Sequence, residues 1–145
     1  MGDELAVLVT VSGADGEGSR ITLSTPGALM DIPGGFVLRY EETSPDDLIA
    51  TQTLVECREN TVTVIRAGGV ISTIVYVENE TFVSEYETSV GQFTLRVFAT
   101  EVRVRRRGAM GHVRLAYQVN LSSDLSPSGD MAMRWLDIRF RPCGS

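Results

Sequence analysis

The sequence of 145 residues contains no lysine, a single histidine and only two cysteines, and each scarcity narrows the available chemistry. The histidine, His112, cannot supply the several imidazoles of a typical zinc site, and it follows Gly111 at an expected turn, outside any packed catalytic relay. Cys57 and Cys143 do not form a redox motif. We therefore expect no metal, no cofactor and no catalytic residues, and the sequence favours a non-enzymatic protein.

Long apolar runs are also missing, since no stretch approaches the roughly 20 residues that a membrane-spanning helix needs. The N-terminus, Met1-Gly2-Asp3-Glu4, is acidic where a secretory signal would be basic. Together with the low cysteine content, these features predict a soluble cytoplasmic protein that does not enter a membrane. All 13 basic residues are arginine, which is typical of G/C-rich codon usage and favours a bacterial source.

Hydrophobic alternation with period two is what the sequence has in abundance, and turn residues interrupt it at short intervals. This pattern is typical of antiparallel β structure, and the short connections favour pairing of neighbouring strands. One helical turn is expected at Ser44-Pro45-Asp46-Asp47, and an interruption near Pro26-Gly27. The expected strands cover 4–12, a run from 20 onward, 36–43, 49–57, 61–67, 71–77, 81–88, 92–107, 113–121 and 131–140.

Two of these runs change their apolar phase, which indicates bending. In 92–107 the change predicts a bulge near Thr100, and in the last run it falls next to Trp135. Strong bending on both sides of a regular strand curls a sheet of about ten strands until its edges meet. We predict one all-β domain, residues 1–145, folded as a closed or nearly closed antiparallel barrel of about 8–10 strands. A two-sheet sandwich is the alternative.

Short polar motifs recur along the strands: Tyr40-Glu41-Glu42-Thr43, Thr51 with Thr53, Arg66-Ala67-Gly68, Tyr86-Glu87-Thr88 with Gly91 and Leu95, Thr100, and Tyr117. Their order and spacing, over about residues 5–140, resemble the YwiB-like family of small bacterial proteins. The resemblance implies a calycin-like, or lipocalin-like, β-barrel in a bacterial cytoplasm, and it supplies no assigned function and no catalytic residues. The Gly-x-Trp motif of true lipocalins is absent near the N-terminus, because the only tryptophan is Trp135.

Polar side chains on the apolar faces of several strands are expected to point into the barrel: Tyr40, Glu42, Arg66, Tyr86 and Tyr117. Small barrels can hold one small molecule oriented by a few convergent polar groups, so this set is a candidate site for an anionic or hydroxylated ligand. The alternative is a structural plug, in which Glu42 pairs with Arg66 and the tyrosine hydroxyls satisfy the remaining partners. A non-enzymatic small-ligand-binding barrel is the first functional hypothesis.

Charge is distributed unevenly along the chain: residues 1–95 have net charge −11 and residues 96–145 have net charge +5. A hairpin in the basic part presents a candidate patch for an anion or a partner: Arg103, Arg105, Arg107 and Arg114. The second hypothesis is an interaction module that binds an acidic protein or nucleic acid through this hairpin. Nucleic acid is disfavoured, because no aromatic residue interleaves with the arginines and the protein is acidic overall. A charged strand can equally serve to protect a sheet edge, and the oligomeric state, a homodimer included, is left open.

Overall fold

The computed structural model describes residues 4–15, 20–42, 50–88, 91–123 and 126–143, which form ten antiparallel strands and no helix. The helical turn expected at 44–47 falls outside these residues. Hydrogen bonding in the order β1-β10-β9-β8-β7-β6-β5-β4-β3-β2 closes the sheet, which confirms the barrel and excludes the sandwich. The strands are β1 (Leu5–Asp15), β2 (Arg20–Ile32), β3 (Gly35–Glu42), β4 (Thr51–Arg58), β5 (Thr61–Ala67), β6 (Val70–Val77), β7 (Thr81–Thr88), β8 (Gly91–Arg107), β9 (Met110–Ser123) and β10 (Ser126–Pro142).

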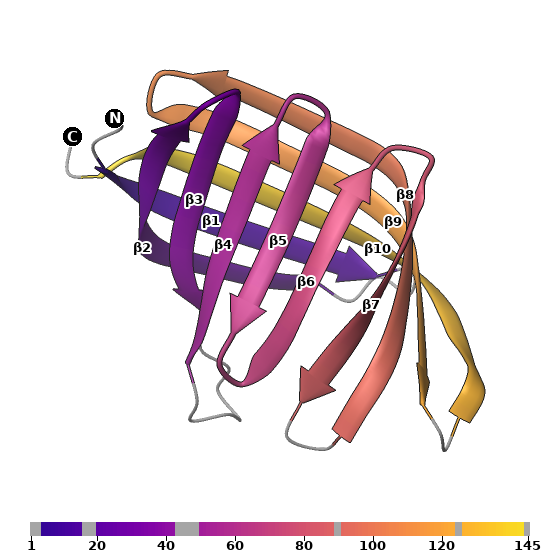
Figure 1. The fold of residues 1–145 in the computed structure, drawn as a ribbon. Helices are drawn as coiled ribbons and strands as arrows, with labels where there is room; N and C mark the ends of the chain where they lie inside the picture. The colour runs from indigo at the N-terminus through magenta and orange to yellow at the C-terminus, as the bar shows by residue number, and fades with distance from the viewer. Residues whose placement is uncertain (1–3, 16–19, 43–49, 89–90, 124–125, 144–145) are drawn as a thin grey trace.

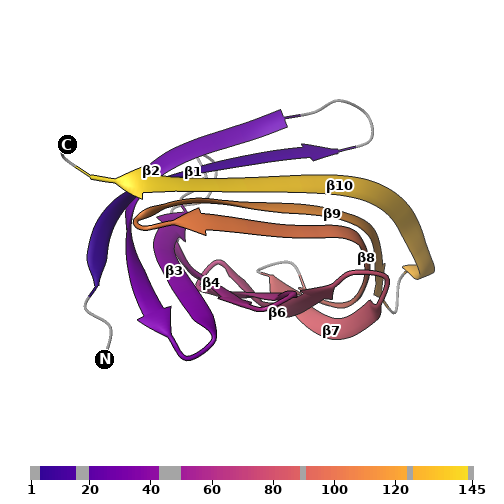
Figure 2. The same ribbon diagram turned by 90° about the horizontal axis from the view of Figure 1, so that it is seen from above.

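The barrel is flattened into two walls whose strands cross. In Figure 1, β3 to β6 form the nearer wall, and β1, β9 and β10 cross behind them. Figure 2 shows β8, β9 and β10 curving around one side of the barrel to link the two walls. Pairing of β1 with β10, from Val7–Pro142 to Asp15–Arg134, completes the closure. Within the described part of the chain there is no helix that could cross a bilayer.

The bulge expected near Thr100 is present and bends β8. The pairing of β8 with β9 shifts register between Ala99 and Glu101, and the Thr100 hydroxyl donates a hydrogen bond of 3.0 Å to the carbonyl oxygen of Ala116. A bulge places one extra residue in one strand and increases the local bend. It therefore turns β8 from one wall into the other while both halves keep their apolar residues inside.

The phase change expected next to Trp135 does not occur, and this prediction is wrong. β10 pairs with β9 without a shift over 130–140, and the register shift lies earlier, between Ser126 and Asp130. Trp135 and Met131 instead lie on the outer face, where they are 36% and 65% exposed. Because β10 carries apolar residues on both faces, its sequence shows the pattern of a phase change although the pairing has none.

β2 continues without a break through Pro26 and Gly27, where an interruption was expected. Its ladder with β3 begins at the Gly27–Tyr40 pair, so Pro26 removes no hydrogen bond from that ladder. Gly27 permits close packing, since a Cβ there would lie 2.6 Å from the Arg39 carbonyl oxygen and 2.8 Å from Cγ2 of Val9. A proline and a glycine are thus accommodated inside one long strand.

Aromatic side chains close one end of the barrel. The rings of Phe36 and Phe140 pack with their centroids 5.5 Å apart, and the guanidinium of Arg106 lies 5.2 Å from the Phe36 centroid. Arg106 also forms an ion pair with Asp31, and its hydrogen bond lowers the pKa of that carboxyl. We call Phe36 and Phe140 the aromatic plug. The barrel interior next to the aromatic plug is apolar, and one register row of apolar side chains crosses the β3–β6 wall: Leu38, Val55, Val64 and Ile74.

Cys57 is buried in this core, 2% exposed, and gives a testable pH dependence. Burial, with a smaller contribution from the charge of Glu56, raises the pKa of the Cys57 thiol from 9.0 to about 12. Above pH 9 the unfolded chain therefore loses a proton that the folded chain keeps, and stability falls as the pH rises. Between pH 8 and 10.5 we expect Cys57→Ala to gain about 2 kcal/mol in free energy of unfolding relative to the wild type.

Urea denaturation of both proteins at the two pH values measures this difference. Tyrosines titrate in both proteins and cancel in the comparison. Parallel stability profiles would show that the folded thiol titrates at its ordinary pH.

Candidate functional site

A row of polar side chains crosses the inner face of the β3–β6 wall. Tyr40 is the register partner of Thr53, Thr53 of Arg66, and Arg66 of Ser72. Residues directly opposite each other in adjacent strands project from the same face of a sheet. Because Tyr40, Thr53 and Ser72 are all buried, this face is the interior of the barrel. We call these four residues, together with Glu42, the interior polar cluster.

Arg66 and Glu42 form a partly buried ion pair within the cluster. The distance from Arg66 Nε to Glu42 Oε2 is 3.6 Å, and the two side chains are 20% and 27% exposed. Burial disfavours the charge on Arg66, but the Glu42 carboxylate and the neighbouring tyrosine hydroxyls together raise the pKa of the guanidinium. Arg66 is therefore a fixed positive charge close to the end of the barrel that lies opposite the aromatic plug.

Three hydroxyl groups of the cluster have no hydrogen-bond partner among the described residues: Tyr40 Oη, Thr53 Oγ1 and Ser72 Oγ. The residues that carry them are 2%, 0% and 4% exposed, so bulk water does not reach them. Most buried polar atoms in folded proteins are paired, and one without a partner costs roughly 1–3 kcal/mol. Three such atoms in one register row mark this part of the interior as a candidate site.

Tyr40 keeps its proton throughout the physiological range. Burial and the charge of Glu42 raise the pKa of this phenol well above its ordinary value, and Arg66 opposes the shift only in part. Glu42 lies near the hydroxyl, yet their contact falls short of hydrogen-bond geometry. Tyr40 therefore offers a neutral hydroxyl that can both donate and accept.

A pair of tyrosines borders the cluster. The rings of Tyr76 on β6 and Tyr117 on β9 lie 5.1 Å apart at an interplanar angle of 59°. Burial, with a smaller contribution from the neighbouring Tyr117 phenol, raises the pKa of Tyr76, which is 1% exposed. Tyr76 and Ser72 were not among the interior residues expected from the sequence, although the alternation of β6 places both on the apolar face with Ile74.

The structure brings four of the five expected interior residues together: Tyr40, Glu42, Arg66 and Tyr117. The fifth, Tyr86, lies on β7, but its side chain is not among those the structure describes. In the described residues no group of three or more His, Cys, Asp or Glu side chains could hold a metal ion.

The expected arginine patch lies on the outer face of the hairpin of β8 and β9, and part of its positive charge is balanced by a carboxylate. Arg103, Arg105, Arg107 and Arg114 are all exposed, as expected for one face. However, Glu101 lies 3.4 Å from Arg103 Nε and 3.2 Å from Arg114 Nε, so it neutralises part of the patch. The candidate patch is therefore reduced to the two arginines nearest the turn of the hairpin, Arg105 and Arg107.

Comparison with known proteins places the chain in a family. Its fold is similar to the crystal structure of the ywiB protein from Bacillus subtilis, with a TM-score of 0.79 and 19% identity over 96% of this chain and 92% of that one. At this identity the similarity supports the fold alone. No curated protein sequence matches this one. The domain of unknown function DUF1934 matches residues 8–134, and the resemblance to YwiB-like proteins is confirmed. The chain therefore belongs to the DUF1934 family of β-barrel domains, whose function is unassigned.

Proposed function

We propose that this protein is a small-ligand-binding barrel of the bacterial cytoplasm, and that the interior polar cluster holds one small hydroxylated anion. The observation that carries the proposal is the register row in which charged Arg66 lies with three buried hydroxyls that have no hydrogen-bond partner among the described residues. A bound molecule that supplies hydrogen bonds to these groups recovers the free energy lost on burying them.

The chemistry of the cluster favours a hydroxy acid. Arg66 supplies a permanent positive charge and planar N–H donors, which suit a carboxylate. The hydroxyls of Tyr40, Thr53 and Ser72 each donate and accept, which suits the hydroxyl groups of a ligand. The Glu42 carboxylate, already close to Arg66, accepts from a further ligand hydroxyl. One cation partly balanced by one carboxylate matches a ligand of low net charge.

A structural plug explains the cluster less well. That alternative requires the ion pair of Arg66 and Glu42, which is present at 3.6 Å, but it also requires the tyrosine hydroxyls to satisfy the remaining polar groups. Among the described residues, the Tyr40 hydroxyl and the hydroxyls of Thr53 and Ser72 in the same row have no hydrogen-bond partner. The partial exposure of Arg66 and Glu42, at the end opposite the Phe36–Phe140 plug, favours access for a ligand from that end.

Binding is also better supported than covalent catalysis. A serine or threonine nucleophile needs a base within hydrogen-bond reach. Neither Ser72 nor Thr53 has a hydrogen-bond partner for its hydroxyl among the described residues, so neither is activated by one of them. The cluster is therefore proposed to recognise a molecule without transforming it.

Thermal unfolding with a panel of monocarboxylic hydroxy acids (glycolate, lactate, glycerate and gluconate) tests the proposal. We expect at least one acid to raise the Tm of the wild type by several degrees, because a ligand at 100 times its Kd stabilises by about 2.7 kcal/mol. Arg66→Met, which removes the charge and keeps most of the side-chain volume, is expected to lose this response.

The matched control is Arg96→Met, which makes the same change at an exposed position of β8 outside the cluster. It is expected to respond as the wild type does. No shift with any acid, or equal shifts in wild type and Arg66→Met, would contradict the proposed site.

A further inference from the structure

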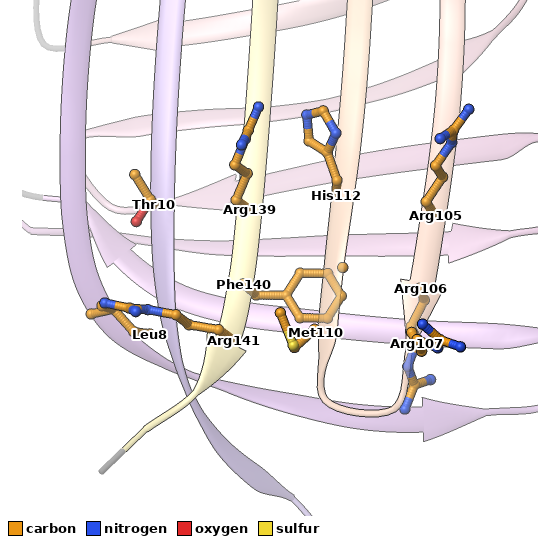
Figure 3. Close-up of a pocket in the computed structure, with 11 residues that line it drawn as sticks. Leu8, Thr10, Arg105, Arg106, Arg107, Met110, His112, Arg139, Phe140 and Arg141 are labelled. Atoms are coloured by element: carbon orange, nitrogen blue, oxygen red, sulfur yellow. The ribbon is translucent and has the colours of Figure 1, made fainter. Parts of the chain in front are cut away.

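A second concave site lies on the outer face of the opposite wall, away from the interior polar cluster. It is a pocket of about 590 Å³ over β8, β9, β10 and β1. Register places Arg105 beside His112, His112 beside Arg139, and Arg139 beside Thr10. Figure 3 shows these four residues side by side across the four strands. Residues that are far apart in sequence thus meet in one row.

Four arginines border this pocket without acidic partners. Arg105, Arg107, Arg139 and Arg141 are exposed, and none forms an ion pair with a described residue. Nearby charges on the same wall are different: Arg103 and Arg114 share Glu101, and His112 contacts Asp137 at 2.5 Å. The uncompensated positive charge is therefore concentrated at the pocket itself.

The floor of the pocket is apolar. Leu8 and Met110 line it, and Met110 is 57% exposed. Gly111 also lines the pocket, and on the inner side of the sheet the ring of buried Phe140 fills the space where a Cβ of residue 111 would lie 2.2 Å from its Cζ. A concave apolar surface surrounded by guanidinium groups can accommodate an organic body as well as anionic groups.

The geometry points to a binding site for a short chain of phosphate groups, either inorganic oligophosphate or the oligophosphate of a nucleotide. Arginines two residues apart on one strand are separated by about 7 Å, and β8 and β10 lie about 10 Å apart with β9 between them. One phosphate cannot reach guanidinium groups spread over such an area, whereas linked phosphates can. Arginine binds phosphate oxygens in a bidentate manner, so the four side chains suit several linked anionic groups.

A nucleic-acid backbone fits the pocket less well. None of the described residues that line it is an exposed aromatic able to stack with bases, and the protein carries a net charge of −6, which repels a long polyanion. The proposal is independent of the interior polar cluster, because the two sites share no residue and lie on different walls.

Isothermal titration calorimetry at low salt, with sodium tripolyphosphate and with magnesium-free ATP as separate probes, tests this site. We expect one tripolyphosphate per chain and an affinity that falls as NaCl is added. The double variant Arg105→Met/Arg139→Met is expected to bind at least about 100-fold more weakly, since each of the two lost charge-assisted contacts is worth about tenfold or more. Arg66→Met is expected to bind as the wild type does, which separates this site from the interior one.

The matched control is Arg103→Met/Arg114→Met, which removes the same charge from the same wall at positions already balanced by Glu101. It is expected to weaken binding by less than about threefold, because only screened long-range attraction is lost. ATP binding as tightly as tripolyphosphate supports a site for the phosphate chain, and tighter ATP binding adds contacts with the apolar floor. The proposal is overturned by no binding of either probe, by equal losses in the two double variants, or by tighter binding of oligothymidylate.

Discussion

Replacing Gly35 by alanine is expected to lower the free energy of unfolding by about 3 kcal/mol. Gly35 opens β3, where the backbone of β4 passes so close that an added Cβ would lie 1.7 Å from the Cys57 carbonyl oxygen and 2.8 Å from its carbonyl carbon. Both atoms belong to a strand in the middle of a wall, so they cannot move aside as a flexible side chain would. Urea denaturation, followed by the fluorescence of Trp135, measures the loss.

Two other glycines provide controls that separate steric overlap from backbone conformation. Gly34 has a φ of +79° but open space around it, so Gly34→Ala is expected to cost only the left-handed strain of about 1–2 kcal/mol. Gly13 has neither problem, since the nearest atom to an added Cβ is 3.8 Å away, and Gly13→Ala is expected to be neutral within about 0.5 kcal/mol. A Gly35→Ala protein as stable as Gly34→Ala would mean that the two strands separate easily at this point.

The barrel could be predicted from sequence because alternation and turns report local geometry. The bulge near Thr100 was readable for the same reason: the apolar residues of one strand exchange faces there, and the interior admits only one face. The change of face predicted next to Trp135 was wrong, because exposed apolar residues on the outer face of β10 look the same in the sequence as buried ones. Periodicity identifies which residues share a face, but not which face water covers.

The candidate sites depend on register, which a single sequence reports poorly. Tyr40 and Arg66 could be assigned to the interior by their apolar neighbours, yet Thr53 and Ser72 are ordinary strand residues until pairing places them in the same row. On the outer wall, the hairpin sequence identified Arg105. Arg139 joins it only because β10 pairs with β9 and the barrel closes.

The uneven charge of the sequence corresponds to the two walls of the barrel. The acidic part of the chain contributes the β3–β6 wall and with it the interior cluster, where one arginine is balanced by one carboxylate. The basic part contributes β8 to β10, where four arginines around the outer pocket form no ion pair with any residue that the structure describes. The two proposed ligands accordingly differ in charge, since the interior suits a weakly charged molecule and the outer pocket a strongly anionic one.

Removing the three unpartnered hydroxyls together, in Tyr40→Phe/Thr53→Val/Ser72→Ala, is expected to stabilise the ligand-free protein. Each substitution keeps nearly the same shape and takes away a buried polar atom that has no hydrogen-bond partner among the described residues. Since each such atom costs at least about 1 kcal/mol, the triple variant is expected to gain at least about 3 kcal/mol in free energy of unfolding, which raises the Tm by roughly 3 °C per kcal/mol. Urea and thermal denaturation without added ligand measure the gain.

The same variant separates a binding site from a structural plug, because the two predict changes of opposite sign. Groups kept to bind a ligand reduce the stability of the empty protein, so their removal raises stability and abolishes the thermal response to hydroxy acids. Hydroxyls that hold the fold together have partners within the protein, so their removal would instead lower stability by about 1 kcal/mol each. Tyr40→Phe alone gives the cleanest comparison, because it deletes a single oxygen and leaves the packing of the ring unchanged. A loss of stability in both the single and the triple variant would assign the cluster to the fold and remove the basis for an interior ligand.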